Sequence, residues 1–341
     1  MKIVASEAHR SHDPRTFLVR GRLGEPREVP ERAKRLLRAA QGAGHAIVAP
    51  RSYDDGVLGL VHTPDYLDFM AEGHAQWRAL PDAGPEIVAN VHPNRAMETY
   101  PKGIVGRAGW HMADTACPLG AGTWAAARAS ADLALTAADL VLDGAPVAYA
   151  LCRPPGHHAF PDMAGGFCFL NNVAIAAERC VARLGHVAIL DVDVHHGNGT
   201  QACFYDRRDV LFASIHGDPA NFYPYFAGYV HERGAGAGLG TTLNLPLPPG
   251  SGDEPWLAAL DRALGAIRRF APRLILVSLG LDAQAGDPLG ILAVSAAGFR
   301  AAGARIAALG LPTVLVQEGG YLCPGLEANL AAFLAGFECG A

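Results

Sequence analysis

The sequence is poor in charged residues and has no closely paired cysteines. Charged side chains account for 18% of its 341 residues, whereas hydrophobic residues account for 50%. A disordered chain combines low hydrophobicity with high net charge, so this composition excludes a disordered protein. The seven cysteines include no Cys-x-x-Cys pair. We therefore interpret them as reduced thiols rather than as the framework of a disulfide scaffold.

The sequence also lacks a long apolar run and an excess of positive charge. No run approaches the roughly 18 apolar residues of a membrane-spanning helix. The apolar run Ile3–Ala5 is too short for the core of a signal peptide, which leads us to expect a cytoplasmic protein. The net charge of −5 argues against a non-specific nucleic-acid binder. We expect neither a membrane nor a nucleic acid as a partner.

From about residue 140 onward, short apolar runs alternate with helical stretches. The expected strands are Val147–Cys152, Val187–Asp191, Val210–His216, Leu274–Gly280 and Thr313–Gln317. Because these runs are continuously apolar, they predict parallel strands that are covered on both faces. The expected helices between them are Val173–Leu184, Glu254–Phe270 and Ala296–Leu309. Such alternation is typical of a three-layer α/β/α domain.

The N-terminal part of the sequence has a different pattern. Ile3–Ser6 predicts a strand, and Pro30–Gln41 predicts an amphipathic helix. Residues 73–123 are rich in glycine, proline and polar residues and predict a long loop, which usually serves as a lid or a subunit contact. The glycine-rich run 234–240 follows no strand and opens no helix, so it predicts a connecting loop rather than a phosphate site. Because no repeat or linker is visible, we expect a single domain over residues 1–341.

The strongest chemical signal follows the apolar run Val187–Leu190. There the sequence reads DVDVHHGNG and places Asp191, Asp193 and His195 at alternate positions. Alternate side chains of an extended chain point to one face. Buried carboxylates would repel one another unless a cation lay between them. Since the ligand sites of open α/β sheets lie at the carboxyl ends of the strands, the motif predicts a metal site.

Three further strand ends carry candidate residues. The run RPPGHH places His157 and His158 after one strand, and adjacent histidines rarely both reach one metal, so at least one is expected to transfer protons. Asp282 follows a second strand, where a lone aspartate could equally cap a helix. Tyr321 follows a third strand and two flexible glycines, and a half-buried core tyrosine is the alternative there.

Together these strand ends predict a metal-dependent hydrolase. Asp193, His195 and Asp282 would form a ligand set of oxygen and nitrogen atoms that suits a catalytic zinc with one open position. Iron, manganese or cobalt would also accept such a set. A metal, a histidine base and a tyrosine hydroxyl are the groups that promote attack of water on a polarised carbonyl.

Six motifs spread along the chain carry a resemblance to a known family. They read RPPGHH, GGFCFLNN, ILDVDVHHGNGTQ, SIHGDP, SLGLDAQAGDP and EGGY. This series resembles that of the arginase/deacetylase superfamily, and it is most similar to the bacterial acetylpolyamine amidohydrolases, which are relatives of the histone deacetylases. The similarity runs nearly from end to end. It implies a zinc-dependent amide hydrolase with an α/β/α fold around a parallel eight-stranded sheet.

The resemblance implies a catalytic role for each strand-end residue. Asp193, His195 and Asp282 would hold one zinc ion per subunit. His158 would be the general base that takes a proton from water. Tyr321 would donate its hydroxyl to the developing oxyanion.

The resemblance also implies supporting contacts behind these residues. His157 would pair with Asp191, and His158 would pair with Asn198, where the best-known histone deacetylases have aspartate. A potassium ion is implied as well, bound by side chains and backbone carbonyls. Its ligands would come from Asp191, Ser214, Asp193, His195 and Ile215.

For the substrate, the resemblance implies a narrow tunnel behind a long loop. Phe167 and Tyr223 would form the tunnel walls, and the Gly166 carbonyl would accept the substrate N–H. The loop over residues 73–123 would narrow the entrance and form a homodimer contact.

Two acidic residues of this loop, Asp114 and Glu98, would attract the distal ammonium of the substrate. The loop lacks the paired glutamates of some family members. Leu289 stands where the polyamine-specific deacetylase of animals has an acidic gatekeeper, so any specificity for polyamines would have to come from the loop.

We therefore expect hydrolysis of a small cationic acetylated amine, of the acetylputrescine or acetylcadaverine type, to the free amine and acetate. An acyl-lysine protein deacetylase is the alternative, although a long loop would obstruct a protein substrate. A two-manganese ureohydrolase would need further carboxylates, and Ala283 and Gln284 do not supply them beside Asp282. A non-catalytic ligand-binding protein would be expected to lose a ligand or Tyr321, and none is missing.

Overall fold

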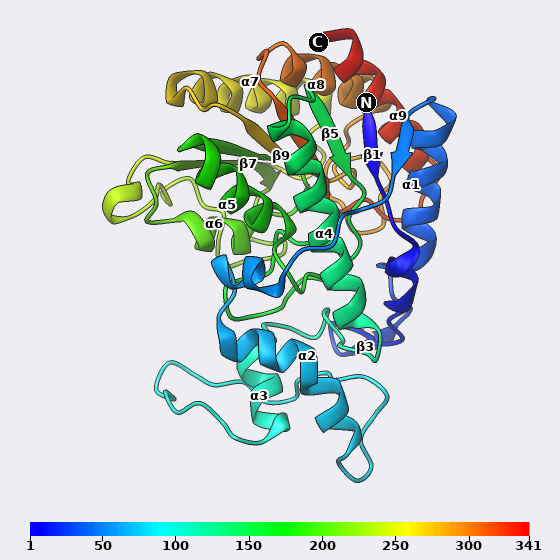
Figure 1. Cartoon of the computed structure of the whole chain (residues 1–341), viewed down its shortest axis with the longest axis vertical. Coiled ribbons are helices and arrows are strands. Elements are labelled where there is room, and N and C mark those ends of the chain that lie inside the picture. Colours follow the sequence, from blue (N-terminus) through cyan, green and yellow to red (C-terminus); the bar gives the residue numbers. More distant parts are fainter. Residues whose placement is uncertain (341) are drawn as a thin grey trace.

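A central sheet of eight parallel strands organises the chain. The computed structural model describes residues 1–340 (Figure 1). In sheet order, the strands are β4 (Ala46–Val48), β1 (Lys2–Val4), β5 (Val147–Ala150), β10 (Thr313–Gln317), β9 (Ile275–Leu279), β6 (Val187–Asp191), β7 (Val210–Gly217) and β8 (Thr242–Leu247). Every pair of neighbours in this sheet is parallel. The eight-stranded parallel sheet implied by the resemblance is thus confirmed.

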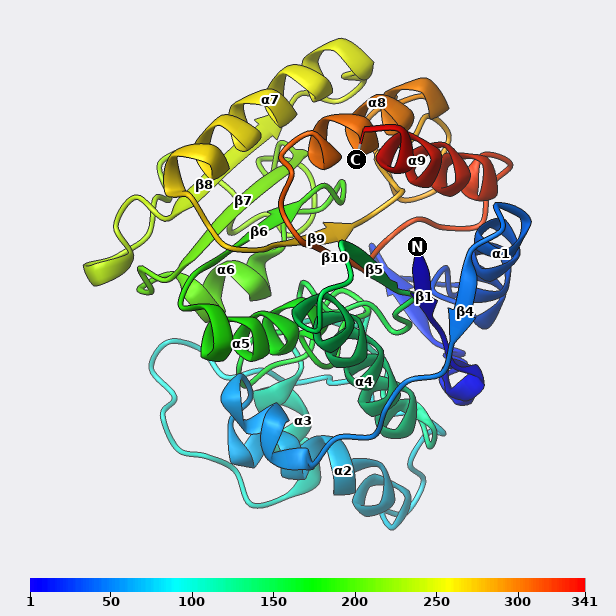
Figure 2. The same ribbon diagram turned by 45° about the horizontal axis from the view of Figure 1, so that its top comes forward.

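Helices cover both faces of the sheet, which confirms the expected three-layer α/β/α fold (Figure 2). One face is covered by α1 (Pro30–Gly42), α7 (Asp253–Phe270), α8 (Ala296–Ala307) and α9 (Leu326–Gly340). The other face is covered by α4 (Thr123–Leu142), α5 (Asn172–Leu184) and α6 (Asn198–Phe204). Successive strand residues alternate between the two cores, since Leu315 lies in one and its neighbours Val314 and Val316 lie in the other. Both faces are apolar, which explains the uninterrupted apolar runs in the sequence.

The predicted elements lie within a few residues of their observed bounds, and local hydrogen bonds explain the differences. The first strand ends at Val4 because Ser6 instead caps the 3-10 helix η1 (Glu7–Ser11), where its hydroxyl accepts from the Ala8 amide. Strand β5 ends at Ala150 because the amide of Cys152 bonds back to the Ala150 carbonyl, 2.9 Å away, rather than to a neighbouring strand.

The prediction of a structureless loop over residues 73–123 is wrong. Helix α2 (Pro64–Arg78) extends into this segment, α3 (Ile104–His111) lies inside it, and α4 begins at its end. Phe69 and Met70 of α2 share a small core with Ile104 and Ala108 of α3. The coil that remains is residues 79–103 and 112–122. Both helices lie away from the central sheet, at the lower end in Figure 1.

The remaining elements are short. They are the antiparallel hairpin β2 (Phe17–Val19) and β3 (Arg22–Gly24), and the 3-10 helices η2 (Asp55–Leu60) and η3 (Gly236–Gly238). Helix η3 lies in the connection before β8, so the glycine-rich run is a connecting loop as predicted. Within residues 1–340, no helix combines the length and the apolarity that are needed to cross a membrane.

A buried charge cluster ties α1 to the carboxyl end of β10. Arg32 donates through Nη1 to Glu28 Oε1 at 2.7 Å, and Arg153 Nε lies 2.8 Å from the same oxygen. Arg32 also donates through Nε to the Gly320 carbonyl at 2.6 Å. Unpaired charges in a protein interior are strongly unfavourable, so Glu28 is what allows both arginines to be buried here. This cluster was not predicted, because Arg153 and Gly320 lie far from Glu28 and Arg32 in the chain.

Candidate active site

The candidate residues follow four adjacent strands of the sheet. These strands are, in sheet order, β5, β10, β9 and β6, and all run in the same direction, so the residues after them lie at one edge. The four predicted strand ends therefore meet. Their candidate side chains are all buried, and they are His157, His158, Tyr321, Asp282, Asp193 and His195.

The predicted metal ligands lie within reach of one ion. Asp193, His195 and Asp282 each place a ligand atom within 4.8 Å of the other two. The Nδ1 atom of His195 lies 3.2 Å from Asp193 Oδ1 and 3.3 Å from Asp282 Oδ2. Both carboxylates are fully buried, and Asp282 Oδ2 accepts no hydrogen bond from the described residues. An unsatisfied buried carboxylate oxygen is what a cation site requires, so this trio fits a metal.

Backbone groups hold the two carboxylates in place. The amide of Val194 donates to Asp282 Oδ1 at 3.0 Å, and the amide of Gly319 donates to Asp193 Oδ2 at 2.7 Å. A Cβ atom at Gly319 would lie 2.1 Å from Asp282 Oδ2. Only glycine therefore fits there, and the EGGY motif places its first glycine where the backbone touches the ligands.

The two carboxylates of this trio favour a protonated, positively charged His195 when no metal is bound. Burial disfavours the charged form of Asp193, but His157 and His195 outweigh burial and keep its pKa well below the usual value. Burial and the nearby Asp193 raise the pKa of Asp282. Burial opposes the charged form of His195, yet its close contacts with the Asp193 and Asp282 carboxylates raise its pKa to about 9. A metal ion would replace the proton on this imidazole.

The adjacent histidines have opposite electrostatic surroundings. His157 Nδ1 lies 3.0 Å from Asp191 Oδ2, and despite burial the charges of Asp193 and Asp191 raise its pKa to about 10. His158 Nδ1 lies 2.7 Å from the side-chain oxygen of Asn198. Burial and the neighbouring His157 lower the pKa of His158 well below the usual value. The surroundings thus favour the protonated form of His157 and the neutral form of His158, so His158 is the histidine with a free lone pair.

Tyr321 lies at the same edge with its hydroxyl protonated. Its side chain is buried, and burial raises its pKa well above the usual value. The Arg32 guanidinium carbon lies 4.7 Å from the centre of its ring, and the Tyr321 amide donates to Asp287 Oδ2 at 2.8 Å. Asp287 also accepts from the Leu289 amide at 2.9 Å, so its carboxylate links the segment after β9 to the Tyr321 backbone.

Aromatic rings surround the reactive groups. The Phe167 ring centre lies 5.7 Å from that of Tyr321, and the Tyr223 ring centre lies 4.9 Å from that of His158. Phe222 stacks on His195 with the ring centres 4.7 Å apart. Phe222 was not predicted, although it directly precedes Tyr223 in the sequence.

The two loop carboxylates differ in their positions. Asp114 Oδ2 accepts from the Gly166 amide at 3.1 Å and from the Tyr223 hydroxyl at 2.7 Å. Asp114 therefore links the 73–123 segment to the predicted wall residues. Glu98 is exposed, and its side chain forms no hydrogen bond or ion pair within residues 1–340.

The predicted potassium ligands lie on neighbouring strands. Asp191 on β6 is paired in register with Ser214 on β7, and both are fully buried. Ile215 follows Ser214 along β7. The Ser214 hydroxyl lies 2.8 Å from His216 Nδ1, which gives it a partner already.

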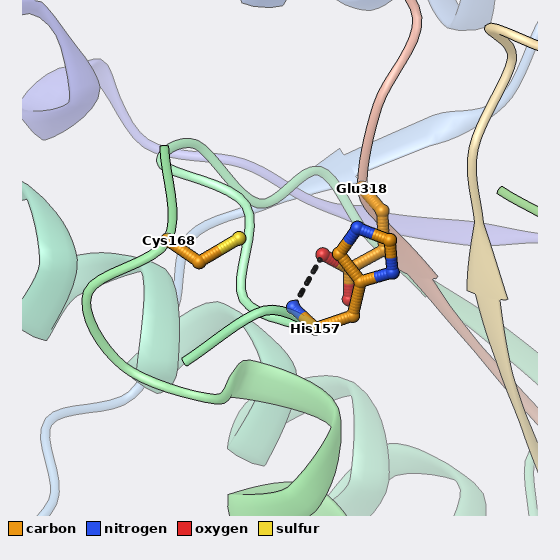
Figure 3. Close-up of side chains that lie close together, drawn as sticks. All are labelled: His157, Cys168 and Glu318. Atoms are coloured by element: carbon orange, nitrogen blue, oxygen red, sulfur yellow. Dashed lines mark hydrogen bonds between the residues drawn. The ribbon is translucent and has the colours of Figure 1, made fainter. Parts of the chain in front are cut away.

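A second group of potential ligands lies behind the histidines and was not predicted. His157, Cys168 and Glu318 place their ligand atoms within 4.8 Å of one another (Figure 3). Burial raises the pKa of the Cys168 thiol well above the usual range, and the thiol donates to the Gly166 carbonyl. Glu318 accepts hydrogen bonds from two backbone amides. A protonated thiol and an already satisfied carboxylate fit a metal less well than the first trio.

Comparison with known proteins is consistent with this geometry. The histone deacetylase domain family matches residues 26–337. The chain belongs to the histone deacetylase family.

Relatives of this histone deacetylase family member match it over nearly their full length. It is 51% identical to the acetylpolyamine amidohydrolase of Burkholderia pseudomallei (strain 1710b), with 96% of this chain and 95% of that protein covered. It is 41% identical to the acetylpolyamine amidohydrolase of Mycoplana ramosa, with 98% and 99% covered. A crystal structure of acetylpolyamine aminohydrolase from Burkholderia pseudomallei superposes with a TM-score of 0.97 at 49% identity, covering 100% of this chain and 99% of that one.

Replacement of Asp282 tests the assignment of the first trio. We expect Asp282→Ala to lose tightly bound metal, because the unsatisfied oxygen is removed and two ligands remain. Elemental analysis of dialysed protein measures the metal content. Asp218→Ala, which removes an exposed carboxylate, should retain it. Equal metal content in the two variants would contradict the assignment.

Proposed function

We propose that this protein is a zinc-dependent amidohydrolase that removes the acetyl group from small acetylated amines, of the acetylputrescine or acetylcadaverine type. The names of the relatives and their nearly complete coverage support this substrate class. The single observation that carries the proposal is the buried Asp193, His195 and Asp282 trio, which lies beside a neutral histidine and a protonated tyrosine.

Zinc is the proposed metal because three protein ligands of this type leave a position open for chemistry. A bound zinc ion would polarise the acetyl carbonyl and lower the pKa of a water molecule. The buried Asp191 and Ser214, together with carbonyls of Asp193, His195 and Ile215, are the proposed ligands of a potassium ion. It would add positive charge beneath the zinc ligands.

His158 is the proposed general base. An amide oxygen only accepts hydrogen bonds, so the short contact with Asn198 assigns the proton of neutral His158 to Nδ1. Its Nε2 then holds the lone pair that takes a proton from the attacking water. The lowered pKa of His158 makes its protonated form a strong acid, which can return this proton to the leaving nitrogen.

Tyr321 and His157 would stabilise the charge that develops during attack. The new bond joins the water oxygen to the acetyl carbon, and the negative charge moves to the carbonyl oxygen. The Tyr321 hydroxyl donates to this oxygen, while the imidazolium of His157 adds a fixed positive charge nearby. The C–N bond then breaks, and the products are acetate and the free amine.

The surrounding rings and loops favour a slender cationic substrate over a protein. Phe167 and Tyr223 are the proposed walls beside an alkyl chain, and Gly166 is the proposed acceptor of its amide N–H. Asp114 is the proposed contact for the distal ammonium, with Glu98 as a second candidate in the same segment. An acyl-lysine protein deacetylase is not favoured by the names of the relatives. A single domain, a homodimer and a cytoplasmic location stay predictions from the sequence.

Removal of the tyrosine hydroxyl tests the proposed oxyanion contact. We expect Tyr321→Phe to retain its metal and to lose turnover by ~10²-fold or more, as is typical when one oxyanion donor is removed. Steady-state kinetics with acetylputrescine, accompanied by elemental analysis, measures both quantities. Near-normal kcat in this variant would exclude Tyr321 from the reaction.

The pH dependence tests the role of His158. Because its pKa is lowered, His158 stays deprotonated well below the usual imidazole value of about 6.5, and kcat should fall only at lower pH. Asn198→Asp places a carboxylate beside Nδ1 and should raise this pKa, so the acidic limb should move to higher pH. An acidic limb that is identical in the two proteins would contradict the assignment of His158 as the base.

A substrate panel tests the proposed function most broadly. The zinc-loaded protein should hydrolyse acetylputrescine, acetylcadaverine or acetylspermidine with higher kcat/KM than acetyl-lysine peptides. Released acetate measures all four substrates in the same way. A preference for the peptides would overturn the small-amine proposal and favour the protein-deacetylase alternative.

A further inference from the structure

Glu318 is a fully buried carboxylate that the proposed reaction does not use. It is the first residue after β10 and lies three residues before Tyr321. No water and no metal are needed to explain its contacts, because protein groups surround it. These contacts extend to both sides of the candidate active site.

One side of Glu318 holds the turn that carries the two histidines. Its Oε2 atom accepts from the Gly156 amide at 2.7 Å. It also accepts from the His157 amide at 3.1 Å (Figure 3). This turn follows β5, whereas Glu318 follows β10, and the two strands are neighbours in the sheet. One carboxylate oxygen thus fixes two successive amides of the RPPGHH motif.

Glu318 itself begins the turn that carries Tyr321, and contacts with β9 and α1 hold it there. Its amide donates to the Leu279 carbonyl at 3.0 Å, and its carbonyl accepts from Arg32 Nη2 at 2.8 Å. Its Oε1 atom accepts from the Ser278 hydroxyl at 3.4 Å. Glu318 is therefore fixed from the backbone to the end of its side chain.

We propose that Glu318 is a positioning residue that sets the distance between the histidine turn and the tyrosine turn. The base and the oxyanion donor come from these different turns, so their relative placement depends on a contact that links the turns. Glu318 provides it, because its backbone belongs to one turn and its carboxylate is bonded to the other. The reach of the side chain, rather than its charge, carries this role.

Three substitutions separate reach from charge. Glu318→Gln keeps the length and an accepting oxygen but loses the charge. Glu318→Asp keeps the charge but is shorter by one methylene, so it retracts from the amides of Gly156 and His157. Glu318→Ala removes both and leaves the two buried amides without a partner.

We expect kcat to be highest in Glu318→Gln, lower in Glu318→Asp and lowest in Glu318→Ala. Misplacement of catalytic groups by about 1 Å can cost ~10²-fold, so we expect Glu318→Ala to lose about that much and Glu318→Gln to stay within about threefold of the unaltered protein. KM for acetylputrescine should change less than kcat, because the wall residues are untouched. Metal content should be unchanged, since Glu318 contacts none of the proposed ligands through its side chain.

Val316→Ala is the matched control. Val316 is buried on β10 two residues before Glu318, and it faces the core rather than the site. Its truncation should lower thermal stability and leave kcat unaltered. If kcat fell in Val316→Ala as much as in the Glu318 variants, general destabilisation would explain the losses, and the proposal would be overturned.

A spectroscopic measurement makes the test independent of the substrate. The ring N–H proton shared by His157 and Asp191 can be followed by proton NMR, and we expect it to shift in Glu318→Asp but not in Val316→Ala. If Glu318→Ala does not fold, the comparison of kcat between Glu318→Gln and Glu318→Asp still decides. A higher kcat in Glu318→Asp than in Glu318→Gln would overturn the proposal, and so would an unshifted proton in Glu318→Asp. The kinetic test rests on the proposed function. A protein that is inactive on every acetylated amine would refute that function, whereas the NMR measurement would still test the positioning role of Glu318.

Discussion

The structure depends on one electrostatic constraint, which is that two buried carboxylates share a site at the carboxyl edge of the sheet. Asp193 and Asp282 are fully buried and lie within 4.8 Å of each other and of His195. Burial without compensation would favour protonation of a carboxylate, and the raised pKa of Asp282 reflects that tendency. The unsatisfied Asp282 oxygen remains available to a cation. A metal ion bound to these two carboxylates and His195 would resolve the constraint.

Strands and backbone groups of the fold hold the two carboxylates at this site. Parallel strands bring four chain segments together at one edge, and a backbone amide donates to each of the two carboxylates. Gly319 allows the backbone to touch both ligands. Arg32 holds the Gly320 carbonyl from α1 and lies over the Tyr321 ring, so a distant helix supports the proposed oxyanion donor. Precise placement on strands and strand ends is what a catalytic site requires.

The sequence predicted the sheet and the central residues because their signals are local. A buried parallel strand is a continuous apolar run, and the polar residues directly after it must lie at the carboxyl edge, as for Asp193 and Asp282. Helices α2 and α3 were not predicted, because glycines and prolines dominate the composition of this segment. The apolar faces of the two helices are short and pack against each other. Glu318, Phe222 and Arg32 were missed for another reason. Their contacts join segments far apart in the chain, and no spacing in the sequence reveals them.

The most direct test of this account is to locate the zinc ion by anomalous diffraction at the zinc edge, in crystals of the zinc-loaded protein. The account predicts one strong peak between Asp193, His195 and Asp282, at full occupancy in each chain. A peak between His157, Cys168 and Glu318, or no peak at either group, would contradict it. The two groups share no ligand, although His157 Nε2 lies 3.8 Å from Asp193 Oδ1, so the peak position distinguishes them.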